Sequence, residues 1–141
     1  RICPVIQSDA GESRNAAEIQ IQVDPTTHVL ASAELLTRAI ANLLRNAVAY
    51  AGQAGPIMVL AQEQEGRVEI LVQDNGPGVA DEFLNRLFDP FFRPEPSRDR
   101  SSGGVGLGMA IVKTCVETCQ GTVSARNQQG GGFVVAITLG P

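Results

Sequence analysis

The glycine-rich stretch at residues 103–108, Gly-Gly-Val-Gly-Leu-Gly, decides the fold assignment of this chain. It leads directly into residues 109–116, Met-Ala-Ile-Val-Lys-Thr-Cys-Val, whose apolar spacing predicts an amphipathic helix. Glycine lets the backbone approach a ligand closely, and the first turn of a helix has unpaired N–H groups that suit a phosphate. The stretch therefore indicates a nucleotide or another anion, although a GxGxG pattern also occurs in ordinary turns.

Length and composition limit the classes of protein to which the chain can belong. Its 141 residues are 43% hydrophobic and 18% charged, which favours one globular domain with a sizeable core. The net charge of −4 argues against general nucleic-acid binding, because that function favours basic surfaces. The longest apolar runs fall short of the ~18 residues that a membrane-spanning helix needs. Because the chain begins without methionine, we expect it to be part of a longer protein.

The periodicity of apolar residues predicts five strands and three helices. The predicted strands are residues 18–23, 57–62, 67–73, 122–126 and 133–139, and the second and third form a hairpin around Glu65-Gly66. The predicted helices are residues 33–51, a short segment at 81–87, and residues 107–119, which Gly121 would cap. This order predicts an α/β (α+β) two-layer sandwich in which three helices cover one mixed sheet.

Two asparagines on the long helix are candidates for chemistry. Asn42 and Asn46 are separated by four residues, so both amides lie on one helix face. An amide oxygen is a neutral, hard ligand that suits Mg²⁺. The alternative is that both side chains form hydrogen bonds within the helix layer, and spacing alone leaves both interpretations open.

One carboxylate and three arginines are candidates for contacts with a nucleotide. Asp74 ends a hydrophobic strand, from which it could recognise an exocyclic amine such as that of adenine, although Asp-Asn-Gly also starts ordinary turns. Arg93, Arg98 and Arg100 make the polar loop before the glycine-rich stretch cationic, and guanidinium groups suit phosphate. A solvated loop with scattered charge is the alternative for the arginines.

Four segments, taken together, resemble the motifs of sensor histidine kinases. They stand in the family's order and spacing, and the resemblance covers about residues 18–140. The segments are the N box (residues 42–47, Asn-Leu-Leu-Arg-Asn-Ala), the first glycine box (74–78, Asp-Asn-Gly-Pro-Gly), the F box (88–93, Phe-Asp-Pro-Phe-Phe-Arg) and the second glycine box (104–108, Gly-Val-Gly-Leu-Gly). Within the family, residues 98–104 most resemble the envelope-stress sensor kinases.

The resemblance implies a Bergerat (GHKL) ATP-binding fold with ATP and Mg²⁺ as cofactors. Asp74 would bind the adenine amino group, Asn46 would hold Mg²⁺ with Asn42 beside it, and Tyr50 would pack against the nucleotide. Residues 93–104 would form a flexible ATP lid. The implied catalytic set is Asn42, Asn46, Arg93 and Arg98. The other implied nucleotide contacts are Gly76, Gly78, Phe92, Arg100, Gly104, Val105, Gly106, Leu107 and Gly108, and Phe88 and Phe91 would join Phe92 in anchoring the lid base to the core.

The same resemblance implies the reaction and the partners. The domain would donate the γ-phosphoryl of ATP to a histidine on a separate dimerisation domain. Residues 1–17 would be a linker or a helix from that preceding domain. A response regulator would then be phosphorylated on an aspartate. The full-length protein would be a homodimer, anchored in the inner membrane with this domain in the cytoplasm, and no nucleic acid would bind.

The sequence departs from the family pattern in two places. Ala49 stands three residues after Asn46, where these kinases often have Lys or Arg, so one phosphate contact is missing. The single histidine, His28, lies in Thr-Thr-His-Val-Leu, which is not the phosphoacceptor motif, so we expect a structural or solvent-facing role. The missing contact keeps a nucleotide-sensing module without phosphoryl transfer open as an alternative, and an anti-sigma-type serine kinase is a third.

Asn42 also separates two kinds of chemistry on this fold. ATP-hydrolysing relatives carry Glu four residues before the Mg²⁺ asparagine, and that carboxylate activates water. An amide is not a base at neutral pH. The resemblance therefore implies slow hydrolysis, whereas transfer to a neutral histidine needs less help.

Overall fold

The computed structural model describes residues 2, 4–7, 18–51, 54–92 and 108–140, and within them it shows the mixed sheet that the sequence predicts. The strands are β1 (Ile19–Gln22), β2 (Ile57–Gln64), β3 (Arg67–Asp74), β4 (Thr122–Asn127) and β5 (Phe133–Leu139). Their order across the sheet is β1-β2-β3-β5-β4. β1 pairs with β2 in parallel, and the other three pairings are antiparallel.

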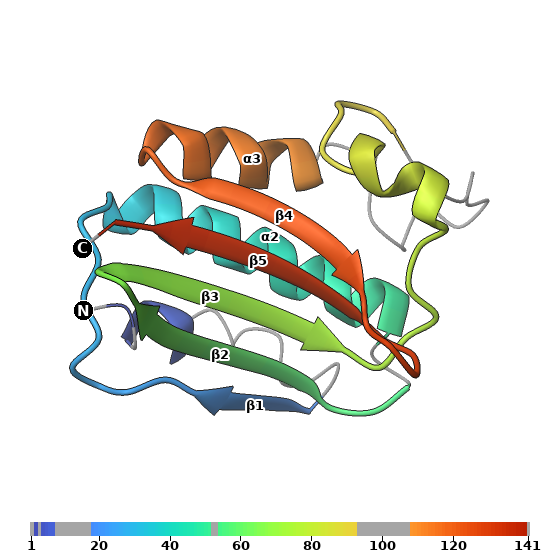
Figure 1. The fold of residues 1–141 in the computed structure, drawn as a ribbon, viewed down its shortest axis with the longest axis horizontal. Coiled ribbons are helices and arrows are strands. Elements are labelled where there is room, and N and C mark those ends of the chain that lie inside the picture. The colour runs from blue at the N-terminus through green and yellow to red at the C-terminus, as the bar shows by residue number, and fades with distance from the viewer. Residues whose placement is uncertain (1, 3, 8–17, 52–53, 93–107, 141) are drawn as a thin grey trace.

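Helices cover one face of this sheet (Figure 1). They are α2 (Ala33–Ala51) and α3 (Gly108–Thr118), and residues 4–7 are also helical. The apolar stripe of α2 is buried, and its first turn is capped by Ser32, whose Oγ accepts a hydrogen bond from the backbone N–H of Leu35 at 3.3 Å. Within the described part of the chain, no helix is both long and apolar enough to cross a membrane.

The core lies between these helices and the inner face of the sheet. On that face, alternate strand residues point toward the helices, which is the period-two pattern of a half-buried sheet. The largest fully buried side chains of the core come from both the helices and the strands, and they include Ile40, Leu44, Ile57, Ile70, Val112 and Ile137. The structure thus confirms the two-layer arrangement with one mixed sheet. His28 is exposed, in accord with the solvent-facing role expected for it.

The short helix expected at residues 81–87 differs from its prediction in form. Asp81–Arg86 is a 3-10 helix, and each of its six residues is exposed or half-buried. It projects beyond the end of the sheet near α3, as Figure 1 shows. The backbone N–H of Phe83 bonds to the carbonyl of Ala80, three residues earlier, which is the 3-10 pattern. The segment therefore borders the end of the two-layer core and covers little of the sheet.

The end of α3 corrects the predicted role of Gly121. Gln120 takes the left-handed conformation, with φ of 62°, and the N–H of Gly121 bonds to the carbonyl of Val116 at 2.9 Å. This is the Schellman ending of a helix, with Gln120 at the position that glycine usually occupies. Glycine is required at 121 for space, because a Cβ there would lie 2.6 Å from both the carbonyl oxygen of Thr138 and Cδ2 of Leu139.

We expect Gly121→Ala to lower the free energy of unfolding by about 1–3 kcal/mol, the usual cost of overpacking. The added methyl would meet backbone that belongs to β5 and cannot rotate away. Gly140→Ala is the matched control, since its Cβ would enter open space. Urea denaturation of both variants measures the difference, and equal stabilities would contradict the close packing at Gly121.

Candidate nucleotide-binding site

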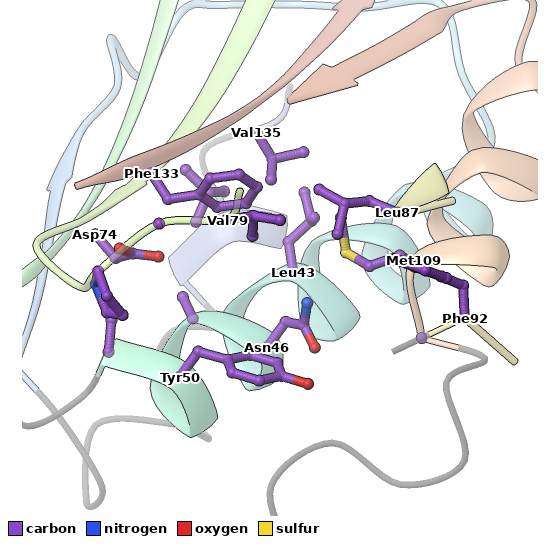
Figure 2. Close-up of a pocket in the computed structure, with 16 residues that line it drawn as sticks. Leu43, Asn46, Tyr50, Asp74, Val79, Leu87, Phe92, Met109, Phe133 and Val135 are labelled. Carbon is purple, nitrogen blue, oxygen red and sulfur yellow. The ribbon is translucent and has the colours of Figure 1, made fainter. Parts of the chain in front are cut away.

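A pocket opens between the C-terminal half of α2, the C-terminal end of β3, the start of β5, the first residues of α3 and residues 77–92 of the segment that follows β3. Figure 2 shows Asp74 at one end of this pocket and Phe92 and Met109 at the other. The lining residues are Leu43, Asn46, Ala47, Tyr50, Ala51, Val72, Asp74, Pro77, Gly78, Val79, Leu87, Phe92, Gly108, Met109, Phe133 and Val135. Most are apolar, so the polar groups among them can fix the orientation of a ligand.

Asp74, the last residue of β3, is the buried carboxylate of this pocket. It is 7% exposed, and its Oδ1 accepts a hydrogen bond from the backbone N–H of Gly76 at 2.9 Å. Burial raises the pKa of Asp74 above its ordinary value, and hydrogen bonds from the backbone of Gly76 and Phe133 oppose that shift. A buried carboxyl group with a raised pKa, facing a pocket, is typical of a functional site.

Asn46 and Tyr50 face the pocket from successive turns of α2 (Figure 2). Tyr50 is 39% exposed, so its ring stands at the mouth of the pocket. Among the described residues, Asn42 lies outside the set that lines the pocket. Its Nδ2 donates to the carbonyl of Arg38 at 2.8 Å, and its Oδ1 would lie 3.6 Å from a methyl group placed on Gly108. Asn42 therefore stands beside the start of α3, one turn away from Asn46.

The two glycines of residues 74–78 have different roles. Gly78 lines the pocket and has φ of +75°, a conformation that glycine adopts without strain. Gly76 lies behind the pocket, where its N–H orients Asp74 and a Cβ would come within 2.6 Å of the Cβ of Ala51. The predicted role of Gly76 in shaping the site is thus indirect.

The three phenylalanines expected to anchor the lid base do not all do so. Phe88 is half-buried against the core, and Phe92 lines the pocket with its ring centroid 5.6 Å from that of Phe83. The guanidinium carbon of Arg86 lies 4.4 Å from the Phe92 centroid, a cation–π arrangement. For Phe91 the prediction is wrong, because its side chain is 70% exposed and does not pack into the core.

Several predicted site residues lie outside the described part of the chain, so their roles stay predictions. They belong to the predicted lid and to the second glycine box, of which Gly108 alone is described. These residues are Arg93, Arg98, Arg100, Gly104, Val105, Gly106 and Leu107.

Sequence reasoning missed the apolar wall of the pocket. Val72 and Asp74 point to the same face of β3, and Phe133 and Val135 to the same face of β5. Asp74 pairs directly with Phe133, which brings the aromatic ring beside the carboxylate. The run of residues 133–139 is almost continuously apolar, so the sequence does not show which of its side chains face the pocket. The pairing of β3 with β5 is also a non-local contact that the sequence does not reveal.

Comparisons with known proteins place the chain in a class. The sequence model described as "Histidine kinase-, DNA gyrase B-, and HSP90-like ATPase" matches residues 31–141. The sensor-like histidine kinase SenX3 of Mycolicibacterium smegmatis is 36% identical over 125 residues, covering 87% of this chain and 33% of that protein. The chain thus spans about a third of the length of this curated relative.

Solved structures agree with this match. The mycobacterial sensor histidine kinase MprB has a TM-score of 0.88 at 27% identity, covering 99% of this chain and 95% of that one. Full-length ShkA, solved in complex with AMPPNP, has a TM-score of 0.84 at 28% identity and covers 99% of this chain and 30% of that one. The chain belongs to the family of histidine kinase-, gyrase B- and HSP90-like ATPases. Its relatives in these comparisons are named sensor histidine kinases.

Proposed function

We propose that this chain binds Mg-ATP and donates the γ-phosphoryl group to a histidine on a separate dimerisation domain, as the kinase domain of a two-component sensor. The observation that carries the proposal is the buried carboxylate of Asp74 in an apolar pocket that also contains Asn46 and Tyr50. Support comes from the family match over residues 31–141 and from ShkA, whose fold is similar and whose structure contains the ATP analogue AMPPNP.

The pocket residues fit an adenine base. The ionised carboxylate of Asp74 can accept a hydrogen bond from an exocyclic amine, and its bond from Gly76 holds the acceptor in place. Val72, Phe133 and Val135 supply apolar surface for a flat ring and exclude water from that hydrogen bond. Tyr50 stands at the mouth, where it can pack against the nucleotide.

The part of the pocket near Asn46 is suited to binding and orienting the phosphates of ATP. The amide oxygen of Asn46 is a suitable Mg²⁺ ligand, with Asn42 one turn away. When bound there, Mg²⁺ would neutralise charge on the phosphates. The Nδ2 of Asn42 is engaged with Arg38, and an amide does not deprotonate water. We therefore propose that the γ-phosphoryl group is transferred to the histidine of the dimerisation domain, and that water attacks it only slowly. Arg93 and Arg98 are the predicted contributors of positive charge.

The partners follow from this reaction. We propose a phosphoacceptor and dimerisation domain in the same protein, a homodimeric full-length kinase, and a response regulator that receives the phosphoryl group on an aspartate. We further propose that this domain faces the cytoplasm of a cell in whose membrane the full-length protein is anchored.

The second candidate function is a nucleotide-sensing module that binds ATP or ADP and controls a partner without phosphoryl transfer. Ala49 is the observation that favours it, because this exposed position on α2 lacks the basic side chain that often contacts phosphate in the family. An anti-sigma-type serine kinase is the remaining alternative, and phosphoserine on a partner protein would identify it.

Labelled ATP distinguishes these candidates. We expect the 141-residue chain to bind ATP and to remain unlabelled, because its acceptor lies elsewhere. Adding the protein's own dimerisation domain, in cis or in trans, should produce acid-labile, base-stable phosphate on that domain. Replacement of its acceptor histidine is the control. Nucleotide binding without any transfer would favour the sensing module, and acid-labile phosphate on the chain alone would contradict the proposal.

A further inference from the structure

The side-chain amide of Asn127 holds the loop that borders the adenine end of the pocket. Asn127 ends β4 and pairs with Phe133 of β5, which in turn pairs with Asp74 of β3. These three residues therefore form one row across the end of the sheet. Asp74 and Phe133 line the pocket directly, whereas Asn127 contacts the pocket's Val79.

The contacts of Asn127 form a clamp on a single backbone unit. Its Oδ1 accepts a hydrogen bond from the N–H of Val79 at 2.9 Å, and its Nδ2 donates to the carbonyl of the same residue at 2.5 Å. The Nδ2 also donates to Oδ1 of Asp81 at 3.1 Å, where the 3-10 helix begins. Because the acceptor and the donor of the amide are both engaged by one residue, the orientation of the side chain and of Val79 is fixed.

The clamp gives a second reason, besides backbone conformation, for glycine at residue 78. A Cβ at residue 78 would clash with Oδ1 of Asn127. The φ of +75° already favours glycine. The absence of a side chain at 78 thus serves a second purpose, since it lets the amide of Asn127 reach Val79.

We propose that Asn127 is a positioning residue that sets the adenine end of the pocket by holding Gly78 and Val79 at a fixed distance from Asp74. The inference rests on the proposed function, because it requires a nucleotide base in this pocket. Asn127 is not among the residues that line the pocket, so it would act through the loop that it holds. It is thus a determinant of selectivity for the base and has no role in phosphoryl transfer.

Affinities of Asn127→Ala for ADP and GDP test this proposal, measured by calorimetry with and without Mg²⁺. We expect ADP to bind about tenfold more weakly, a loss of about 1.4 kcal/mol, because the loop must then be ordered at the expense of binding energy. The loss should be the same with and without Mg²⁺, because the clamp lies at the base end. Weak GDP binding should change little, so the preference for ADP over GDP should fall.

Val123→Ala is the matched control for a general loss of stability. Val123 lies on the same strand and packs against the core away from the clamp, so this variant should lower the melting temperature but retain the affinity for ADP. If Asn127→Ala fails to fold, Asn127→Asp replaces it, because the aspartate keeps the acceptor for Val79 and loses both donated hydrogen bonds. That variant should also bind ADP more weakly with no change in the Mg²⁺ effect.

A double-mutant cycle with Gly78→Ala tests the contact itself. Gly78→Ala alone should weaken ADP binding, and its effect should be smaller in the Asn127→Ala background, because the methyl group then has space. Additive effects, an unchanged preference for ADP, or an equal loss of ADP and GDP affinity would each overturn the role of Asn127. Failure of the unmodified chain to bind ADP or ATP would instead contradict the proposed function.

Discussion

Asp74→Asn is expected to lower the affinity for ATP and ADP by about 100-fold, since a charge-assisted hydrogen bond is worth about 1.5–3 kcal/mol and an unmatched group adds to the loss. The asparagine oxygen can still accept the bond from Gly76, so the new NH₂ group would face the adenine amine, donor against donor. Isothermal calorimetry at pH 7 measures the loss. Affinity equal to that of the unmodified chain would contradict the assignment of Asp74 to the base.

The same substitution should raise the melting temperature at pH 7, and this separates lost binding from lost folding. The pKa of Asp74 is raised by burial, so its ionised form is disfavoured in the folded state. The contribution of Asp74 to the free energy of unfolding is therefore favourable below its ordinary pKa of 3.8, and it is lost as the pH rises through the raised pKa of the folded state. Asparagine removes that cost at neutral pH, and the difference in melting temperature should shrink as the pH falls toward 3.8.

Glu69→Gln is the matched control for the Asp74 variant. Glu69 lies on the same strand, on the opposite face of the sheet, where it accepts a hydrogen bond from Gln62 at 3.0 Å. The change removes one carboxylate from β3 without altering the pocket. It should leave nucleotide affinity unchanged, so a loss comparable to that of Asp74→Asn would point to a general charge effect.

Local signals were sufficient to predict most of the secondary structure. The bounds of α2 match the prediction of residues 33–51, because Ser32 caps its start and an uninterrupted apolar stripe follows. The hairpin turn at Glu65-Gly66 is also confirmed, with φ of 53° and 78° at the two residues, as a tight turn between twisted strands requires. Both signals act over a few neighbouring residues, which is why a single sequence reveals them.

The features that the sequence did not reveal depend on contacts between distant segments. Gly121 is glycine because β5 passes close to it, and the capping conformation falls on Gln120 instead. The clamp of Asn127 on Val79 joins residues 48 positions apart. Read locally, Asn127 is a turn residue at the end of a strand. Its function becomes visible only when β4, β5 and β3 are aligned across the sheet.

Asn46→Ala is expected to remove most of the dependence of nucleotide affinity on Mg²⁺, by at least about tenfold, because the substitution deletes the proposed metal ligand from the pocket. Binding without Mg²⁺ should be nearly unchanged, since Asp74 and the apolar wall remain. Phosphoryl transfer to the dimerisation domain should fall about 10²–10³-fold, the usual effect of losing one stabilising group at the reacting phosphate. Calorimetry with and without Mg²⁺ measures the first effect, and labelled ATP the second.

Comparing Asn46→Ala with Asn42→Ala shows which amide has the larger part in metal binding. The Nδ2 of Asn42 is engaged with the carbonyl of Arg38, while Asn46 faces the pocket directly. We therefore expect the Mg²⁺ effect to fall further in Asn46→Ala than in Asn42→Ala. Asn85→Ala, which removes an exposed amide from the 3-10 helix, is the control and should change neither the nucleotide affinity nor its dependence on Mg²⁺. A full Mg²⁺ effect in both α2 variants would place the metal elsewhere, and the acidic chain would then need ligands from outside this helix.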